Sequence, residues 1–166
     1  QESMDLFQAF SDMGHQGILG LLKSGSIKND PLLLAKKLGI NPLETKLALE
    51  RLTRLGWIKV TDTGLELVER YEYVRDELIV SALKRFHRDI LEKALSSFEL
   101  WGEEHSSFTV KTVSINPKQI PKAKEKIEVF CHELVEFLQE VESSELYNMA
   151  VELFPFRGKE FQSNNC

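Results

Sequence analysis

Features of secreted, membrane-bound and cross-linked proteins are scarce in this sequence. Its 166 residues include only 2 cysteines, Cys131 and Cys166, and these show no paired spacing. No apolar run approaches the roughly 20 residues that a membrane-spanning helix needs. The first residues are acidic and do not resemble a signal peptide. We therefore expect a reduced, cytoplasmic protein that does not enter a membrane.

The sequence also lacks an excess of positive charge. Residues 1–70 contain nine Lys and Arg and nine Asp and Glu, so their charges cancel. Residues 71–166 contain twelve against seventeen, which gives −5 and equals the net charge of the whole chain. Because phosphate contacts dominate the affinity for nucleic acid, we expect this chain alone to bind DNA only weakly.

Common catalytic motifs are missing as well. The sequence has no glycine-rich phosphate-binding loop, no G-x-S-x-G and no C-x-x-C. These motifs hold phosphates, nucleophiles or redox thiols in many enzymes. We therefore expect a protein that is not an enzyme and that has no cofactor and no metal.

Residues 30–68 predict two helices followed by a hairpin, the order found in the core of a winged helix. Pro31 and Pro42 each follow a capping Asp or Asn, and proline suits the first turn of a helix. Gly39 and Gly56 are suited to ending the two helices. Two short alternating runs then flank a glycine-containing turn, which predicts the hairpin.

Apolar spacing predicts the remaining elements. In order, we expect one or two helices in residues 1–24, a long helix in residues 76–100, a strand in residues 107–115, a helix in residues 116–141 and a strand in residues 146–156. The expected fold class is α+β and mostly helical. A winged-helix-like half would occupy residues 1–70, and an α-β-α-β half in residues 71–166 would dock on it.

The second helix of the winged-helix core has an outward side that is only partly basic. Leu43 and Leu47 lie on this side, and we favour their packing on the N-terminal helices or on the second half. A protein partner that covers them is the next interpretation, and DNA is the third. DNA contacts would come from the basic residues of this helix and the hairpin, Lys46, Arg51, Arg54 and Lys59.

Histidines provide the candidates for a polar site. His87 falls inside the apolar stripe of the long helix, where we expect a neutral, hydrogen-bonded core residue. The functional alternative is an internal pocket or a protonation switch formed with Phe86 and Ser81. His15 is expected at an exposed loop or helix end.

A later helix carries a second candidate set. Glu128, His132 and Glu136 are spaced as ligands on one helix face would be, but we expect a solvated surface rather than a metal site. Cys131 lies in the apolar stripe of the same helix, where burial would make its thiol inert.

Four short segments follow one another in a characteristic order and spacing: Leu55-Gly56-Trp57-Ile58, Ser81 with Arg85-Phe86-His87-Arg88, Thr112-Val113-Ser114, and Leu153-Phe154-Pro155-Phe156. With them, the chain resembles the C-terminal domain of unknown function in a bacterial family of predicted transcription regulators. Members of that family carry a lambda-repressor-like helix-turn-helix before this domain. The resemblance implies a regulatory role and supplies no catalytic residues.

The sequence departs from that family in two respects. The family usually has a Tyr and a Trp in an aromatic cluster near the start of the domain, where this chain reads Phe7-Gln8-Ala9-Phe10-Ser11-Asp12. The helix-turn-helix is not part of the given sequence, so we expect either an excised domain or a shortened relative.

We therefore expect a non-enzymatic regulatory module that serves dimerisation and the binding of an effector or partner. The partner would be a second copy, another protein, or a helix-turn-helix domain in the same polypeptide. A homodimer is expected because two strands alone leave unpaired edges, and pairing across a two-fold axis would also bury Phe154 and Phe156. Leu43 and Leu47 are further candidates for an interface. Direct DNA binding and a small-molecule site centred on His87 are the alternatives.

Overall fold

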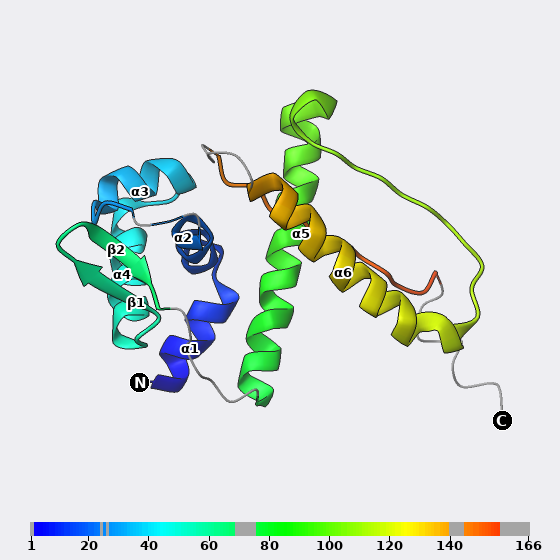
Figure 1. The fold of residues 1–166 in the computed structure, drawn as a ribbon, viewed down its shortest axis with the longest axis horizontal. Coiled ribbons are helices and arrows are strands. Elements are labelled where there is room, and N and C mark those ends of the chain that lie inside the picture. Colours follow the sequence, from blue (N-terminus) through cyan, green and yellow to red (C-terminus); the bar gives the residue numbers. More distant parts are fainter. Residues whose placement is uncertain (1, 24, 26, 69–75, 140–144, 157–166) are drawn as a thin grey trace.

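The computed structural model describes residues 2–23, 25, 27–68, 76–139 and 145–156. In chain order its elements are α1 (Glu2–Ser11), α2 (Met13–Lys23), α3 (Pro31–Leu38), α4 (Pro42–Arg54), β1 (Ile58–Thr61), β2 (Gly64–Leu67), α5 (Glu77–His105), a 3-10 turn η1 (Pro117–Gln119) and α6 (Ile120–Gln139). Figure 1 shows α1 to α4 and the hairpin gathered at one end, α5 beside α1, and α6 further towards the other end. These residues are mostly helical with a small two-stranded sheet, which confirms the expected α+β class at this coarse level.

Two helices rather than one occupy residues 2–23. Asp12 separates α1 from α2, and its carboxylate accepts a hydrogen bond from the backbone N–H of His15 at 3.1 Å. Such a bond satisfies a free N–H group in the first turn of a helix. A capping aspartate therefore starts α2 immediately after α1 ends.

The predicted caps of α3 and α4 are confirmed. The side chain of Asp30 accepts from the backbone of Leu32 and Leu33, and the side chain of Asn41 does the same for α4. Gly39 follows α3 with a φ of 65°, in the left-handed region that glycine adopts without strain. These local signals fix both ends of α3 and the start of α4.

The predicted hairpin is also present. β1 and β2 pair antiparallel, with Thr61 opposite Gly64 across a two-residue turn. On the other side of β2, Ile27 and Leu65 form an isolated antiparallel bridge. Gly64 has a φ of 142°, and a Cβ atom there would overlap the carbonyl oxygen of Ile27, so this approach requires glycine.

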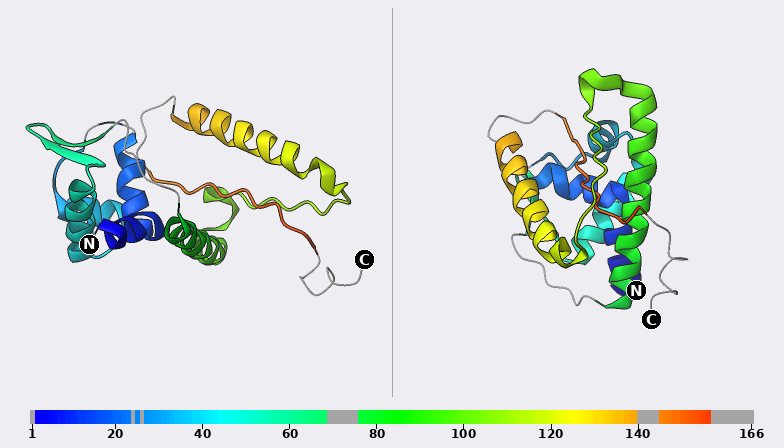
Figure 2. Two further views of the ribbon diagram at one scale, coloured as in Figure 1. Left: turned by 90° about the horizontal axis from the view of Figure 1, so that it is seen from below. Right: turned by 90° about the vertical axis from the view of Figure 1, so that its right-hand side faces the viewer.

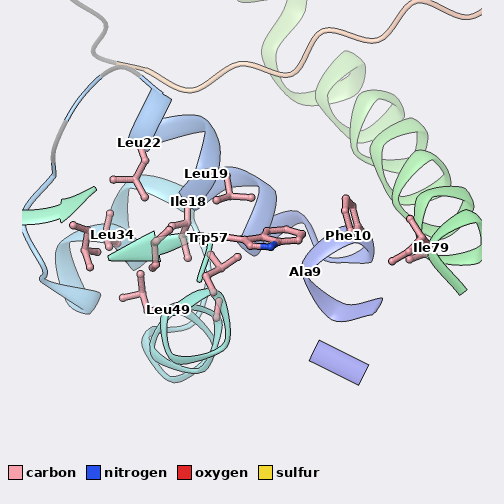
Figure 3. Close-up of a cluster of buried hydrophobic side chains, with 14 residues drawn as sticks. Ala9, Phe10, Ile18, Leu19, Leu22, Leu34, Leu49, Trp57 and Ile79 are labelled. Atoms are coloured by element: carbon pink, nitrogen blue, oxygen red, sulfur yellow. The ribbon is translucent and has the colours of Figure 1, made fainter. Parts of the chain in front are cut away.

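A single apolar core holds the N-terminal helices and the hairpin together. Figure 3 shows it gathered around Trp57, whose ring meets that of Phe10 edge to face with 5.0 Å between centroids. Ile79 and Ala82 of α5 belong to the same cluster, so the start of α5 packs against α1. The inward side of α4 contributes Thr45, Ala48, Leu49 and Leu52, which are all buried, and Leu55, which is partly buried.

Helix α5 leaves this core and extends into the C-terminal half. Asp76 caps its first turn by accepting from the backbone of Ile79. Gly102 interrupts the helix with a φ of 65° and a ψ of −174°, close to the predicted end at residue 100. The predicted apolar stripe is covered only in part, because Ile90 is buried whereas Phe98 is exposed.

The C-terminal half differs most from the sequence prediction. Residues 107–115 and 146–156 were expected to be strands, and this is wrong, because within the described chain neither segment belongs to a β-ladder. Alternating apolar residues favour an extended backbone, but they do not provide the neighbouring edge that a strand needs. Figure 2 shows both segments running along α6, on the side that faces α5. The sequence further predicts a short polar and aromatic connector at residues 71–75, and the tail would begin at residue 158. These segments and the expected helix end at residue 141 lie outside the described residues.

Within the described part of the chain, no helix combines the length and the apolar character needed to cross a membrane.

Candidate functional site

A network of charged side chains joins α1, α2 and α4. Asp5 on α1 is buried, and it accepts from Nε of Arg51 at 3.1 Å and from Nη2 of Arg54 at 2.9 Å. The Arg54 guanidinium, assisted by that of Arg51, lowers the pKa of the Asp5 carboxyl, although desolvation acts in the opposite direction. A buried carboxylate with two guanidinium partners is fully satisfied, so this contact ties α1 to α4.

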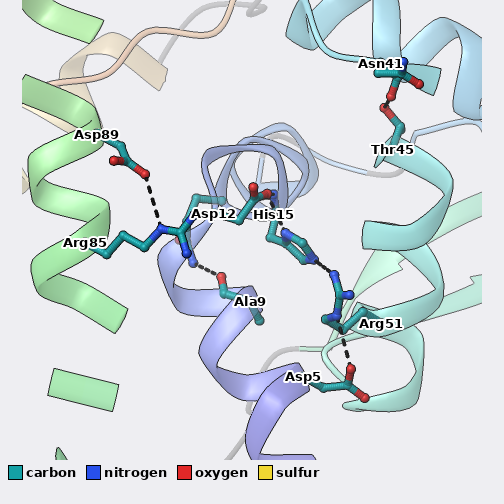
Figure 4. A network of polar contacts seen from close by, with 10 residues as sticks. Asp5, Ala9, Asp12, His15, Asn41, Thr45, Arg51, Arg85 and Asp89 are labelled. Carbon is teal, nitrogen blue, oxygen red and sulfur yellow. Dashed lines mark hydrogen bonds and ion pairs between the residues drawn. The ribbon is translucent and has the colours of Figure 1, made fainter. Parts of the chain in front are cut away.

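His15 continues the network into α2. Its Nδ1 atom lies 2.6 Å from Oδ1 of Asp12, and its Nε2 atom lies 2.8 Å from Nη1 of Arg51 (Figure 4). A guanidinium can only donate, so Nε2 must accept, and the ring proton is on Nδ1 and donates to Asp12. The hydrogen bond from His15 lowers the pKa of Asp12. The arrangement therefore defines one neutral tautomer of His15.

The network holds the helices together but offers no catalytic group. An Asp–His pair can activate a nucleophile only if the second ring nitrogen faces the reacting group. Here Arg51 occupies that nitrogen, and only 4 % of the His15 side chain is exposed. The expectation that His15 is exposed is wrong, because the Asp12 cap turns its side chain inward. A capping Asp three residues before a His is the sequence signal that could have indicated this.

The four basic residues considered for DNA binding are each paired with a carboxylate. Arg51 and Arg54 bind Asp5, Lys46 lies 4.0 Å from Glu50, and Lys59 lies 3.0 Å from Glu66. The Lys59 ammonium also lowers the pKa of Glu66. A cation that already faces a carboxylate is less available to a phosphate, because the competing anion must be displaced.

His87 is not a core residue. It is exposed, and its Nδ1 atom lies 2.7 Å from the carbonyl oxygen of Leu83, one turn earlier on α5. Ser81 is exposed and Phe86 is half-buried, with its ring 6.3 Å from that of His87. The core prediction fails because the covered side of α5 follows Ile79 and Ile90, which are buried, whereas His87 lies about 80° around the helix axis from Ile79, at the edge of that side. An open hollow on α6 is formed by residues of that helix alone, so it includes neither His87 nor its neighbours.

The later helix bears no metal centre in the described part of the chain. His132 lies 3.3 Å from Glu136, and both side chains are exposed. The described residues contain no group of three His, Cys, Asp or Glu that could hold a metal ion. Cys131 is a free thiol that is half-buried, so its expected burial is only partial.

All four candidate interface residues are accessible. Their exposed fractions are 64 % for Leu43, 46 % for Leu47, 78 % for Phe154 and 92 % for Phe156. The favoured packing of Leu43 and Leu47 within the chain is therefore wrong, because neither the N-terminal helices nor the described residues of the second half cover this side of α4. Phe154 and Phe156 are available to a partner, as an interface would require.

A contact that sequence reasoning missed links the C-terminal segment to α2. The Leu146 side chain is seated over Gly17 and Gly20, where added Cβ atoms would lie 3.5 and 3.2 Å from its methyl groups. Glycines three residues apart share one face of a helix and allow such an approach. Their spacing with Gly14 was the available signal, although it predicts only a close neighbour and not which residue supplies it.

Comparison with known protein families assigns this mostly helical α+β domain to one of them. A domain of unknown function, DUF4423, matches residues 3–156. The match covers nearly the whole chain, and the chain belongs to this family. No curated protein and no solved structure matches the chain.

Proposed function

We propose that this chain is a non-enzymatic regulatory module whose C-terminal half provides a surface for protein association. One observation carries the proposal: no residue of α6 is fully buried, and large apolar residues are exposed along the described residues of the C-terminal half. Large exposed residues of this half include Phe98, Leu100, Trp101, Val110, Phe137, Tyr147 and Phe154. Soluble monomers rarely expose contiguous apolar patches of more than a few hundred Å².

The N-terminal half supports this proposal by contrast. Its helices and hairpin, together with the start of α5, close a core around Trp57. We propose that it is winged-helix-like, because α3, α4 and the hairpin follow that order. In this proposal it is a rigid base for α5, since its four candidate DNA contacts are paired with carboxylates.

The regulatory part of the proposal comes from the resemblance to predicted transcription regulators. A separate helix-turn-helix in the same polypeptide would then read DNA in the cytoplasm, and this domain would bring copies or partners together. The buried histidine supports a role without catalysis, because Arg51 occupies the ring nitrogen of His15 that a general base would use.

Sedimentation and dye binding test the proposal together. Over a range of concentrations, we expect the chain either to form an assembly or to remain at 19.1 kDa and bind anilinonaphthalene sulfonate strongly. Leu100→Ser should reduce assembly or dye binding, whereas Met4→Ser, at an exposed position of α1, should not. A monomer that binds no dye would contradict the proposal, because no uncovered apolar surface would then exist.

A further inference from the structure

Two extended segments of the C-terminal half have no backbone partner among the described residues. Within the described chain, residues 107–115 and 146–156 form no β-ladder, and the backbone hydrogen bonds found outside helices and strands do not involve them. Unpaired N–H and C=O groups along an extended segment can pair with another chain. Figures 1 and 2 show both segments running away from the N-terminal helices in the same general direction, while Figure 1 shows them apart from each other.

The exposed area is larger than a folded chain of this mass requires. The accessible surface of the chain is 13802 Å², whereas a compact monomer of 19.1 kDa exposes roughly 8,400 Å². A stable obligate dimer buries about 1,000–2,500 Å² on each copy. The excess of about 5,400 Å² therefore leaves room for an interface of this kind.

We infer that the partner of this half is a second copy of the chain, and that the two copies together form a four-stranded antiparallel sheet with two strands from each copy. Residues 146–156 of each copy would insert between the two extended segments of the other. The strand order would be 107–115, the partner's 146–156, 146–156, and the partner's 107–115. This inference rests on the proposed function and specifies the partner of the same surface.

Symmetry favours a second copy over an unrelated strand. The two segments of one copy run in the same direction, so a two-fold axis between the copies makes all neighbours in this order antiparallel. Only the outer edges of the two 107–115 segments then remain open. One foreign strand would pair with the facing edges of a single copy and leave both outer edges unpaired.

The side chains of the segments are suited to this pairing. Lys111 is the only charged residue in residues 107–115, whereas Glu152 is the only one in residues 146–156. Adjacent segments from different copies would therefore bring opposite charges together. Met149, Val151 and Leu153 alternate along the second segment and are only partly covered in one copy, so one face of the sheet would be apolar towards α6.

Hydrogen exchange of the full chain, read together with its mass, tests the inference. We expect a dimer of twice 19.1 kDa in which the amides of residues 107–115 and 146–156 exchange at least tenfold more slowly than in the dissociated chain. A dimer without this protection would overturn the inference but leave the proposed function intact. A chain that stays monomeric and binds the dye would do the same.

Matched substitutions locate the interface. Phe154→Asp alters a side chain that is exposed in one copy, so it should dissociate the dimer and remove the protection without unfolding the N-terminal half. Leu43→Asp makes the same kind of change on α4 and should leave the mass unchanged. If Leu43→Asp dissociates the dimer and Phe154→Asp does not, the copies meet through α4 and the inference fails.

A cysteine scan tests the strand order. In a Cys131→Ser and Cys166→Ser background, single cysteines are introduced at residues 148–152. Where two identical antiparallel strands are neighbours, one position on the two-fold axis lies next to the same position in the partner chain. We expect one of these variants to form a disulfide-linked dimer, and Lys59→Cys in the hairpin not to do so. A dimer in which no position in residues 148–152 cross-links would overturn the proposed order.

Discussion

The Nε2 atom of His15 accepts a hydrogen bond from the guanidinium of Arg51, with 2.8 Å between the two nitrogens. The same guanidinium donates to Asp5 on α1 through Nε at 3.1 Å. Arg51 therefore connects three helices with one planar group. A lysine has a single nitrogen and cannot reproduce both contacts in this geometry.

Arg51→Lys should accordingly lower the free energy of unfolding by about 1–3 kcal/mol, because one buried partner loses its hydrogen bond. Urea denaturation monitored by circular dichroism would measure the change. Lys46→Gln is the control, since its pair with Glu50 is exposed, and it should change stability by no more than about 0.5 kcal/mol. Equal effects of both substitutions would show that the network does not stabilise the fold.

The pH dependence of stability should report on Asp5 and Asp12. Both carboxyls have a lowered pKa in the folded protein. Their contribution is therefore complete above the unfolded value of about 3.9 and is lost as the pH falls through the lower folded value. Stability should drop below about pH 4, and Asp5→Asn should flatten this drop. An acid limb that is unchanged in Asp5→Asn would contradict the assignment.

Alanine substitutions at Gly17 and Gly20 on α2 should have unequal effects on stability. At Gly17, a Cβ atom would lie 2.7 Å from Leu38, whose side chain packs against the core. Gly17→Ala should therefore destabilise by about 1–3 kcal/mol, and Leu38→Val should relieve part of this cost. Gly20→Ala should be neutral or stabilising, because Leu146 is partly exposed and can shift while alanine gains about 1 kcal/mol of helix propensity. Thermal melts would measure the stability of Gly17→Ala, of Gly17→Ala combined with Leu38→Val, and of Gly20→Ala. A larger loss of stability for Gly20→Ala than for Gly17→Ala would contradict this explanation.

Two histidines on different helices should respond differently to substitution. His87→Ala removes an exposed ring with one backbone contact, so it should change stability by less than about 0.5 kcal/mol. His15→Ala removes a buried ring and leaves Asp12 and Arg51 each without a partner, which should cost about 1–3 kcal/mol. Chemical denaturation of both variants would measure the two changes in the free energy of unfolding. A larger loss for His87→Ala would restore it as a core residue.

The chain should bind duplex DNA weakly. The candidate contacts on α4 and β1 are paired with carboxylates, and the net charge is −5. Titration against random duplexes at physiological salt should give an affinity in the range of non-specific binding, about 10⁻⁴–10⁻⁶ M. A sub-micromolar affinity that falls steeply with added salt would contradict this, because the slope counts phosphate contacts.

Local signals in the sequence were sufficient for the N-terminal half. Asp30, Asn41 and Gly39 act on the backbone within a few residues of themselves, so their effect does not depend on the rest of the fold. The apolar face of α4 likewise follows from the helical period of its own residues. For these elements, sequence and structure agree because the interactions that define them are short-range.

The candidate site was less accessible to sequence reasoning. Asp5, His15 and Arg51 are far apart in the chain and meet only when α1, α2 and α4 pack together. His87, by contrast, was placed in the core from helical period alone. A period identifies which residues share a face, but it does not say how much of that face a neighbour covers.

The sequence by itself determined both ends of α3, the start of α4 and the position of the hairpin, and it indicated which segments are extended. Only the tertiary structure decided that Arg51 bonds to His15, that Leu146 is seated on α2, and that residues 107–115 and 146–156 have no strand partner within the described chain. The physical reason is the range of the interactions. Capping and backbone preference act over a few residues, whereas burial and strand pairing depend on surfaces that distant segments, or a second molecule, must supply.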